Sequence, residues 1–204
     1  MSDIFPHLPS KTGEPAWEAA YFFPPQGRWS EEDFLTFHTT QMAELVNGHL
    51  EILPMPNIKH QQMLLMLLDL IRDNTKAGPG GLALFAPLPT KLFPGTIREP
   101  DLLYISPENV PGPEVEYPSR IDLAVEIVSD GTEARKRDYE DKKIDYAKAG
   151  VAEYWIVDPK DQTVTVLVLS GSTYIDHDCF PVGQTATGKL LPGLAVDVQS
   201  LMNV

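Results

Sequence analysis

The chain has 204 residues, of which 43% are hydrophobic and 22% charged, a composition that suits one domain with a sizeable buried core. Its 16 basic and 29 acidic residues give a formal net charge of −13, which excludes a protein that coats nucleic acid through bulk positive charge. The single cysteine, Cys179, excludes an intramolecular disulfide. The longest apolar-rich stretch, 63–71, is too short to cross a bilayer. Because the N-terminus shows no signal-peptide pattern, we expect a cytoplasmic protein that contacts no membrane.

Residues 1–28 are rich in proline and glycine with scattered aromatic side chains, which predicts an irregular arm ahead of a single domain over 29–204. That domain should begin with a short helix ending near Thr39, because Ser30 is a favoured N-cap and three acids follow it. Asn47-Gly48 lies between two alternating runs, which is the strongest short-range hairpin signal. We therefore expect a β-hairpin over residues 43–53.

Apolar spacing predicts a mostly buried helix over residues 59–75. Further along, runs rich in β-branched residues predict strands at 82–86, 102–105, 121–128, 153–157 and 163–169. A second helix is expected over 135–148, with Gly150 as its stop, and the tail after Ser172 should form a hairpin that crosses residues 181–183. Together these elements predict an α/β or α+β domain, in which helices flank a central mixed sheet that carries an extra β-hairpin.

Two acidic residues stand out in the middle of the chain. Glu126 lies within the most apolar run, where an unpaired carboxylate is costly, so it should be paired, protonated, bound to a cation or directed to the sheet edge. Asp101 follows Pro100 and opens a predicted strand, where capping that strand is a plainer alternative. His60 could face a site, although a capping or surface role fits its place at the start of the long helix better.

The predicted helix after Glu126 carries mixed charges, which is typical of a solvated face. Tyr139 and Tyr146 indicate its inward side. At roughly 100° per residue, Lys142 lies about 40° from Tyr146 and about 60° from Tyr139, and Lys143 is the mirror case. Spacing alone therefore leaves open which lysine could reach a site beside the sheet.

Five blocks of sequence occur in a distinctive order: Glu-Leu-Val-Asn-Gly at 44–48, Glu-Pro-Asp-Leu-Leu-Tyr at 99–104, Val-Glu-Ile-Val-Ser at 125–129, Asp-Lys-Lys-Ile-Asp-Tyr at 141–146 and Gly-Val-Ala-Glu-Tyr-Trp-Ile-Val-Asp-Pro at 150–159. In this order they resemble the Uma2 family of restriction-endonuclease-like proteins, within the PD-(D/E)XK nuclease superfamily. The resemblance covers about residues 30 to 195 and is most specific over 125–159. It implies a restriction-endonuclease-like fold, with acids at strand ends converging on a metal ion.

The same resemblance implies roles for individual residues. Asp101 and Glu126 match the family's two acids, which would bind Mg²⁺ or Mn²⁺ together with the backbone carbonyl of Ile127. Lys142 matches the family's lysine on the following helix. The superfamily usually has its lysine two residues after the second acid, but Val128 occupies that position in this chain. Glu44 matches an acid beside the family's Asp-Gly turn, which in this chain is Asn47-Gly48.

These matches imply a metal-dependent endonuclease that hydrolyses DNA phosphodiester bonds, with Asp101, Glu126, Lys142 and Glu44 as its catalytic residues. Carboxylate oxygens suit Mg²⁺ and Mn²⁺, and a bound cation would offset the cost of burying Glu126. With a net charge of −13, DNA should bind weakly. The contact would be a local basic strip of Arg135, Lys136, Arg137, Lys142 and Lys143.

A second hypothesis is a catalytically silent binding or assembly module that keeps the nuclease fold, within a mobile-element or defence system. The acidic charge, Val128 in place of the usual lysine and the aromatic arm favour it. The arm and the need to cut two strands also favour a homodimer.

Overall fold

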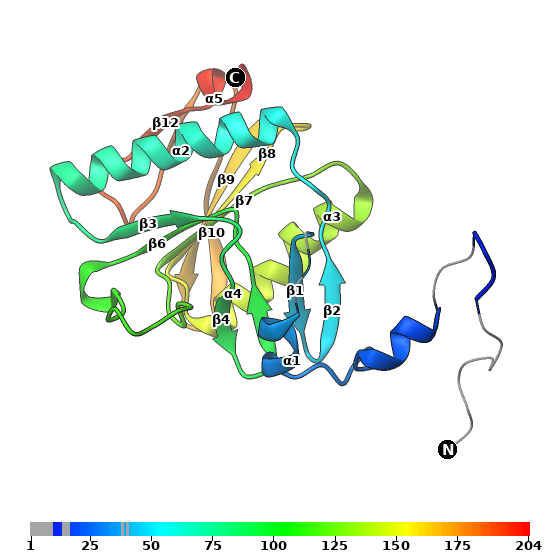
Figure 1. Cartoon of the computed structure of the whole chain (residues 1–204). Coiled ribbons are helices and arrows are strands. Elements are labelled where there is room, and N and C mark those ends of the chain that lie inside the picture. The colour runs from blue at the N-terminus through cyan, green and yellow to red at the C-terminus, as the bar shows by residue number, and fades with distance from the viewer. Residues whose placement is uncertain (1–9, 14–16, 38, 40) are drawn as a thin grey trace.

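A six-stranded mixed sheet forms the centre of the computed structural model, which describes residues 10–13, 17–37, 39 and 41–204 (Figure 1). Its strand order is β10-β9-β8-β7-β6-β3. The strands are β3 (Leu82–Phe85), β6 (Leu102–Ile105), β7 (Leu123–Ile127), β8 (Glu153–Asp158), β9 (Thr163–Ser170) and β10 (Thr173–Pro181). Strands β7 and β8 pair in parallel, whereas the other pairs are antiparallel. A parallel pair needs a long crossover, which the helical segment between β7 and β8 supplies.

That crossover consists of α3 (Thr132–Lys136), the π-helical turn η3 (Arg137–Asp141) and α4 (Lys142–Ala149). It ends at Gly150, whose left-handed backbone (φ 79°) suits a glycine stop. The helix expected over 135–148 is confirmed, but its π-helical turn is not visible in the apolar spacing. Both tyrosines lie on the inward side, as expected, because Tyr139 packs against the buried cluster that contains Tyr146. Tyr146 is fully buried, whereas Tyr139 is partly exposed and donates to Asp158.

The central sheet lies between α2 (Ile58–Ala77) and α4 (Figure 1). Side chains of β7 alternate between the two faces, as a strand requires. Leu123, Val125 and Ile127 pack in the cluster that contains α2, and Ala124 packs in the cluster that contains Tyr146 of α4. Glu126 therefore faces α4, inside the protein.

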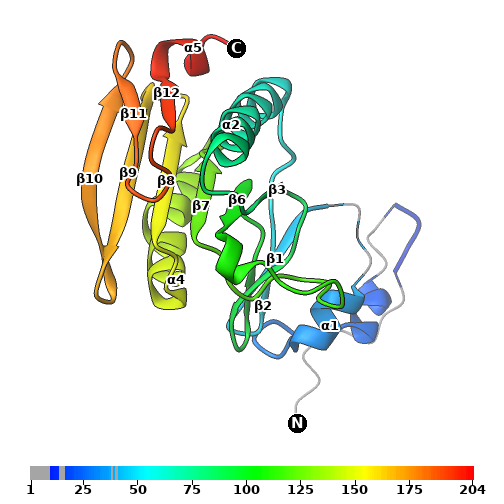
Figure 2. The same ribbon diagram turned by 90° about the vertical axis from the view of Figure 1, so that its left-hand side faces the viewer.

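A second, antiparallel sheet has the order β2-β1-β5-β4 and lies on the opposite side of the molecule from β10 (Figure 2). Its strands are β1 (Ala43–Val46), β2 (His49–Ile52), β4 (Thr90–Phe93) and β5 (Thr96–Arg98). The predicted hairpin is confirmed, with Asn47 and Gly48 both at positive φ as a tight two-residue turn needs. Strands β4 and β5 escaped prediction because they are short and joined by Pro94-Gly95. The helix α1 (Glu31–Thr36) begins at its Ser30 cap, as expected, and ends slightly early.

The hairpin predicted across residues 181–183 is wrong. Strand β10 pairs with β9, and β11 (Thr185–Thr187) pairs with β12 (Ala195–Asp197), which leads into α5 (Val198–Met202). Residues 181–183 instead form a turn, in which Gln184 N–H donates to the Pro181 carbonyl, that carries the chain out of the large sheet. Beyond it, Ala186 and Val196 are buried in the α2 cluster. Strand β10 also has a bulge between Asp176 and Asp178.

Part of the arm expected over residues 1–28 lies outside the described residues. The described part contains the 3₁₀ helix η1 (Trp17–Phe22), which projects from the body (Figure 1). Phe23 then stacks on the buried Trp29, with ring centroids 6.2 Å apart. A further 3₁₀ turn, η2 (Pro107–Asn109), follows β6. Across the described ranges, no helix has the length and apolar character needed to span a membrane.

Replacing Gly81 by alanine should destabilise the fold more than the same change at Gly95. Both glycines have positive φ, +88° and +79°, so each alanine should cost about 1–2 kcal/mol of backbone strain. At Gly81 the new Cβ would also lie 2.5 Å from the Ile105 carbonyl oxygen, whereas nothing lies within 4 Å at Gly95. Urea denaturation should therefore show an additional loss of about 2 kcal/mol for Gly81→Ala. Equal losses would contradict the close approach of Gly81 to β6.

Candidate active site

The acids singled out by sequence meet where β6 begins and β7 ends. Because these strands are antiparallel, with Leu102 opposite Val125, Asp101 lies beside the last residues of β7. Here a cavity of about 20 Å³ leaves room for one water or one small cation. Four acidic and two basic side chains line it: Glu99, Asp101, Glu126, Asp138, Arg137 and Lys142. The lining thus has a formal excess of two negative charges, with His60 counted as neutral.

Asp101 is held by two neighbours from different elements. Its Oδ2 accepts a hydrogen bond of 2.7 Å from the backbone N–H of Ile127 and lies 3.1 Å from Nε2 of His60. The side chain of Asn57, which caps α2, accepts a hydrogen bond from the backbone N–H of His60 and does not contact its ring. The ring therefore faces Asp101, and the capping or surface role expected for His60 is wrong. Burial alone would lower the pKa of His60, but the contact with Asp101 outweighs it and raises this pKa.

Glu126 lies within hydrogen-bonding distance of two side chains of α4. Its Oε1 accepts from Nζ of Lys142 at 2.8 Å and from the hydroxyl of Tyr146 at 2.6 Å. Burial raises the pKa of Glu126 well above its usual range, Lys142 opposes this, and repulsion from Asp101 and Asp138 adds to it. The Glu126 side chain therefore depends on nearby cations for its negative charge.

The structure distinguishes the two lysines that spacing left equivalent. Nζ of Lys142 lies between Glu126 and Glu44, 2.8 Å and 3.0 Å from their oxygens. Lys143 points away and lies 3.8 Å from Asp176. Burial would lower the pKa of Lys142, but Glu126 and Glu44 outweigh burial and raise it. Lys142 is therefore a charged ammonium group at neutral pH.

Glu44, from β1, uses both carboxylate oxygens. Oε1 accepts from Lys142 and from the backbone N–H of Glu99, and Oε2 accepts from Arg98 at 2.8 Å. Burial tends to raise the pKa of Glu44, but Lys142 and Arg98 outweigh it and lower this pKa to about 2. Arg98 also binds Asp145 of α4 and Glu51 of β2, so it ties the second sheet to the helix.

Three further side chains line the cavity, Glu99, Arg137 and Asp138, and the sequence did not predict any of them as part of the active site. Asp138, four residues before Lys142, is buried, and burial raises its pKa. Its Oδ1 lies 3.4 Å from Nε of Arg137, yet neither atom forms a hydrogen bond. Burial, followed by repulsion from Glu44, raises the pKa of Glu99 to about 7, and its Oε2 is buried without a partner. The spacing of four that joins Asp138, Lys142 and Tyr146 is the one sequence signal that could have found Asp138.

The residues present fit a single divalent cation. Oδ1 of Asp101 and Oε2 of Glu126 accept no hydrogen bond from the part of the chain that the structure describes. Within that part, no group of three or more His, Cys, Asp or Glu side chains is arranged to hold a metal. A site of two carboxylates and the Ile127 carbonyl needs only two such side chains. The excess negative charge and the small cavity match one Mg²⁺ or Mn²⁺.

The basic strip predicted on the crossover is not formed. Lys142 is buried, Arg137 faces the cavity, and Arg135 pairs with Asp158 and Asp161. A groove of about 550 Å³ instead adjoins the cavity, and four residues line both: Pro54, His60, Ile127 and Ser129. Lys59 and Lys160 also line this groove, and neither pairs with an acid among residues 10–13, 17–37, 39 and 41–204.

The site thus consists of acids at neighbouring strand ends and a lysine from the crossover helix. The fold that carries it is similar to that of solved structures. The crystal structure of a putative nuclease belonging to DUF820 from Anabaena variabilis ATCC 29413 matches with a TM-score of 0.69 at 20% sequence identity, covering 85% of this chain and 97% of that chain. The fold is therefore the restriction-endonuclease-like α+β fold expected from the sequence. No curated protein matches the chain.

The sequence profile of the Uma2 family, described as putative restriction endonuclease, matches residues 29–199. The chain belongs to the Uma2 family, which confirms the resemblance carried by the five sequence blocks.

Replacing Glu44 by glutamine should destabilise the protein in a pH-dependent way. A folded-state pKa of about 2, against an ordinary value of 4.5, stabilises the fold above about pH 4.5, and this stabilisation is lost as pH falls towards 2. Urea denaturation at pH 7 should show a loss of about 3 kcal/mol for Glu44→Gln, which shrinks on acidification. Glu51→Gln is the matched control, because Glu51 also contacts Arg98 but is 42% exposed, and it should cost less than about 1 kcal/mol. A difference that is constant with pH would contradict the ion network.

Proposed function

We propose that this protein is a Mg²⁺- or Mn²⁺-dependent endonuclease that hydrolyses phosphodiester bonds of DNA. One observation carries the proposal: Asp101 and Glu126 lie at adjacent strand ends around a cavity with excess negative charge, and the ammonium group of Lys142 contacts Glu126. Membership of the Uma2 family supports the nuclease class.

Asp101, Glu126 and the carbonyl of Ile127 would hold the cation. When bound, the cation supplies Lewis-acid chemistry, polarising a phosphoryl oxygen and lowering the pKa of a water molecule. The chain orients its own ligands: the N–H of Ile127 fixes Asp101, while Lys142 and Tyr146 fix Glu126. In each carboxylate, one oxygen is held by these hydrogen bonds and the other would bind the cation.

Lys142 acts as a charged hydrogen-bond donor and not as a base, because its pKa is raised. Its ammonium group can orient the attacking water and stabilise the negative charge that develops on the phosphate. Glu44 has no oxygen left for a cation, so we assign it a positioning role: it holds Lys142 and Arg98 in place.

The groove lined by Lys59 and Lys160 is the proposed path of the DNA strand. It shares four residues with the active-site cavity and contains two lysines without acidic partners among the described residues. The N-terminus of α2, at Asn57, also borders it and favours phosphate groups. A homodimer and a cytoplasmic location stay predictions from the sequence.

Nicking of supercoiled plasmid in the presence of Mg²⁺ or Mn²⁺ tests the catalytic assignment. Asp101→Asn and Glu126→Gln should each lower the rate at least about a hundredfold, and chelation of the cation should abolish nicking. Lys142→Met should have a comparable effect, whereas Lys143→Met, its neighbour in sequence, should leave the rate within about twofold of wild type.

Because Lys142 is buried, thermal unfolding of each variant must show that it is folded. If folded Asp101→Asn and Glu126→Gln nick as fast as wild type, the assignment is wrong.

Binding of a short DNA duplex, followed by fluorescence anisotropy without divalent cations, tests the groove. Changing Lys59 and Lys160 together to glutamate should weaken binding and reduce the slope of log affinity against log salt by about 2, since each phosphate contact contributes roughly 0.9. The matched control changes Lys136 and Lys143, which lie near acids, to glutamate and should have a smaller effect. If the control variant instead weakens binding more than the Lys59 and Lys160 variant, the DNA follows the crossover helix and not the groove.

A further inference from the structure

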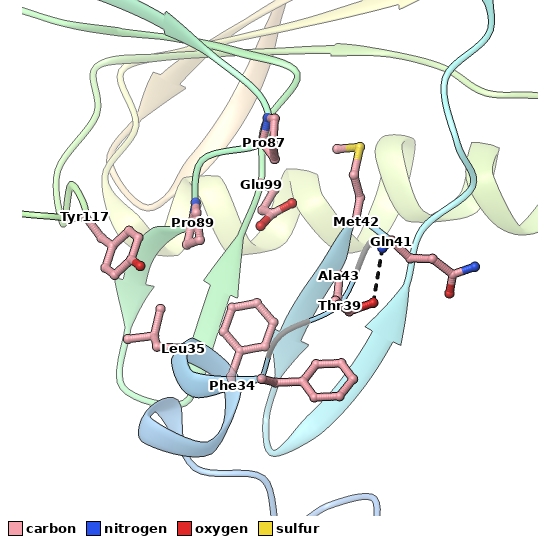
Figure 3. Close-up of a pocket in the computed structure, with 11 residues that line it drawn as sticks. Phe34, Leu35, Thr39, Gln41, Met42, Ala43, Pro87, Pro89, Glu99 and Tyr117 are labelled. Atoms are coloured by element: carbon pink, nitrogen blue, oxygen red, sulfur yellow. Dashed lines mark hydrogen bonds between the residues drawn. The ribbon is translucent and has the colours of Figure 1, made fainter.

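A second cavity, of about 220 Å³, lies beside the active site. Figure 3 shows it between α1 and the strands of the second sheet, with the rings of Phe34 and Tyr117 and the flat side chains of Pro87 and Pro89 around it. Met42 and Glu99 line both this cavity and the active-site cavity. The two cavities therefore adjoin, and a ligand in one could continue into the other.

Glu99 is the charged side chain among the described residues that line this second cavity. It is 7% exposed, and Figure 3 shows its carboxyl group at the centre of the lining residues. Oε2 is buried without a hydrogen-bond partner. A buried carboxylate without donors is costly, so the cavity suits a ligand that brings hydrogen-bond donors to Glu99.

The lining sets two requirements for that ligand. It must be flat and largely apolar on its faces, so that it can pack on Phe34, Tyr117 and the prolines. It must also present two neighbouring donors, because a carboxylate binds best to a bidentate partner. Among the DNA bases, guanine meets both requirements, with N1–H and N2–H side by side on one edge. Adenine and cytosine put an acceptor beside their amino group, and thymine flanks its single donor with two acceptors.

We propose that this cavity binds an unpaired guanine base of the DNA strand, next to the phosphate that is cleaved; this placement rests on the proposed function. Only Pro100 separates Glu99 from Asp101 in sequence, so their backbones lie at most roughly 7 Å apart. That spacing is comparable to the separation of a base from its own phosphate within one nucleotide. Glu99 thus reads the base while Asp101 lies at the phosphate.

Isothermal titration calorimetry at pH 8, on the full chain without divalent cations, tests the proposal. The probes are dGMP, dAMP, dCMP and TMP, and five-nucleotide single strands with and without one guanine. Wild type should bind dGMP and the guanine-containing strand at least about fivefold tighter than the others. Glu99→Gln should lose this preference, and Tyr117→Leu should weaken binding of the guanine probes at least about fivefold. Asp101→Asn, which removes a proposed metal ligand but leaves the second cavity intact, should keep the preference.

Each outcome separates the two proposals once thermal unfolding shows that the variants are folded. A guanine preference that depends on Glu99 supports the base-binding cavity even if plasmid is never nicked, in which case the proposed nuclease function alone fails. Metal-dependent nicking without any guanine preference overturns the cavity assignment and leaves the nuclease. A preference that Glu99→Gln retains overturns it as well. Preference for dGMP without preference for the guanine-containing strand overturns the placement beside the cleaved phosphate.

Discussion

The rest of the structure depends on the ion pairs that the buried ammonium group of Lys142 forms. This group joins α4 to β7 through Glu126 and to β1 through Glu44, and Arg98 extends the same network from β5 to Asp145. Removing one partner from a buried ion network leaves an uncompensated charge, which is far more costly than the pair is stabilising. The second sheet, the crossover helix and the central sheet are therefore held in register by charge as well as by apolar packing.

Strand register and the crossover together concentrate negative charge at one point. The antiparallel pairing of β6 with β7 brings Asp101 next to Ile127, and the parallel pairing of β7 with β8 forces the chain through α3, η3 and α4. The same helical segment then returns Asp138 and Lys142 to the end of β7. An apolar cluster packs on each face of the sheet. The burial of these clusters stabilises the fold and offsets the repulsion among the acids.

Much of this arrangement can be predicted from sequence, because it follows from local patterns. The Asn47-Gly48 turn, the Ser30 cap and the apolar runs define their elements through short-range chemistry, and the five blocks identify the family together with Asp101, Glu126 and Lys142. The ring of His60 and the carboxyl group of Glu99 could not be placed, since both depend on contacts between elements far apart in the chain. The choice between Lys142 and Lys143 also needed coordinates, because a π-helical turn precedes them and changes the angular spacing that an α-helix would impose.

Strand β10 lies at the edge of the large sheet, where unpaired backbone groups could recruit a strand from another molecule. Its bulge falls between Asp176 and Asp178, and Pro181, which has no N–H to offer, ends it. Like charges and an interrupted ladder disfavour continuous edge-to-edge extension. If two molecules of this protein associate, their large sheets should therefore not pair edge to edge through β10. The same features disfavour amyloid-like aggregation along this edge.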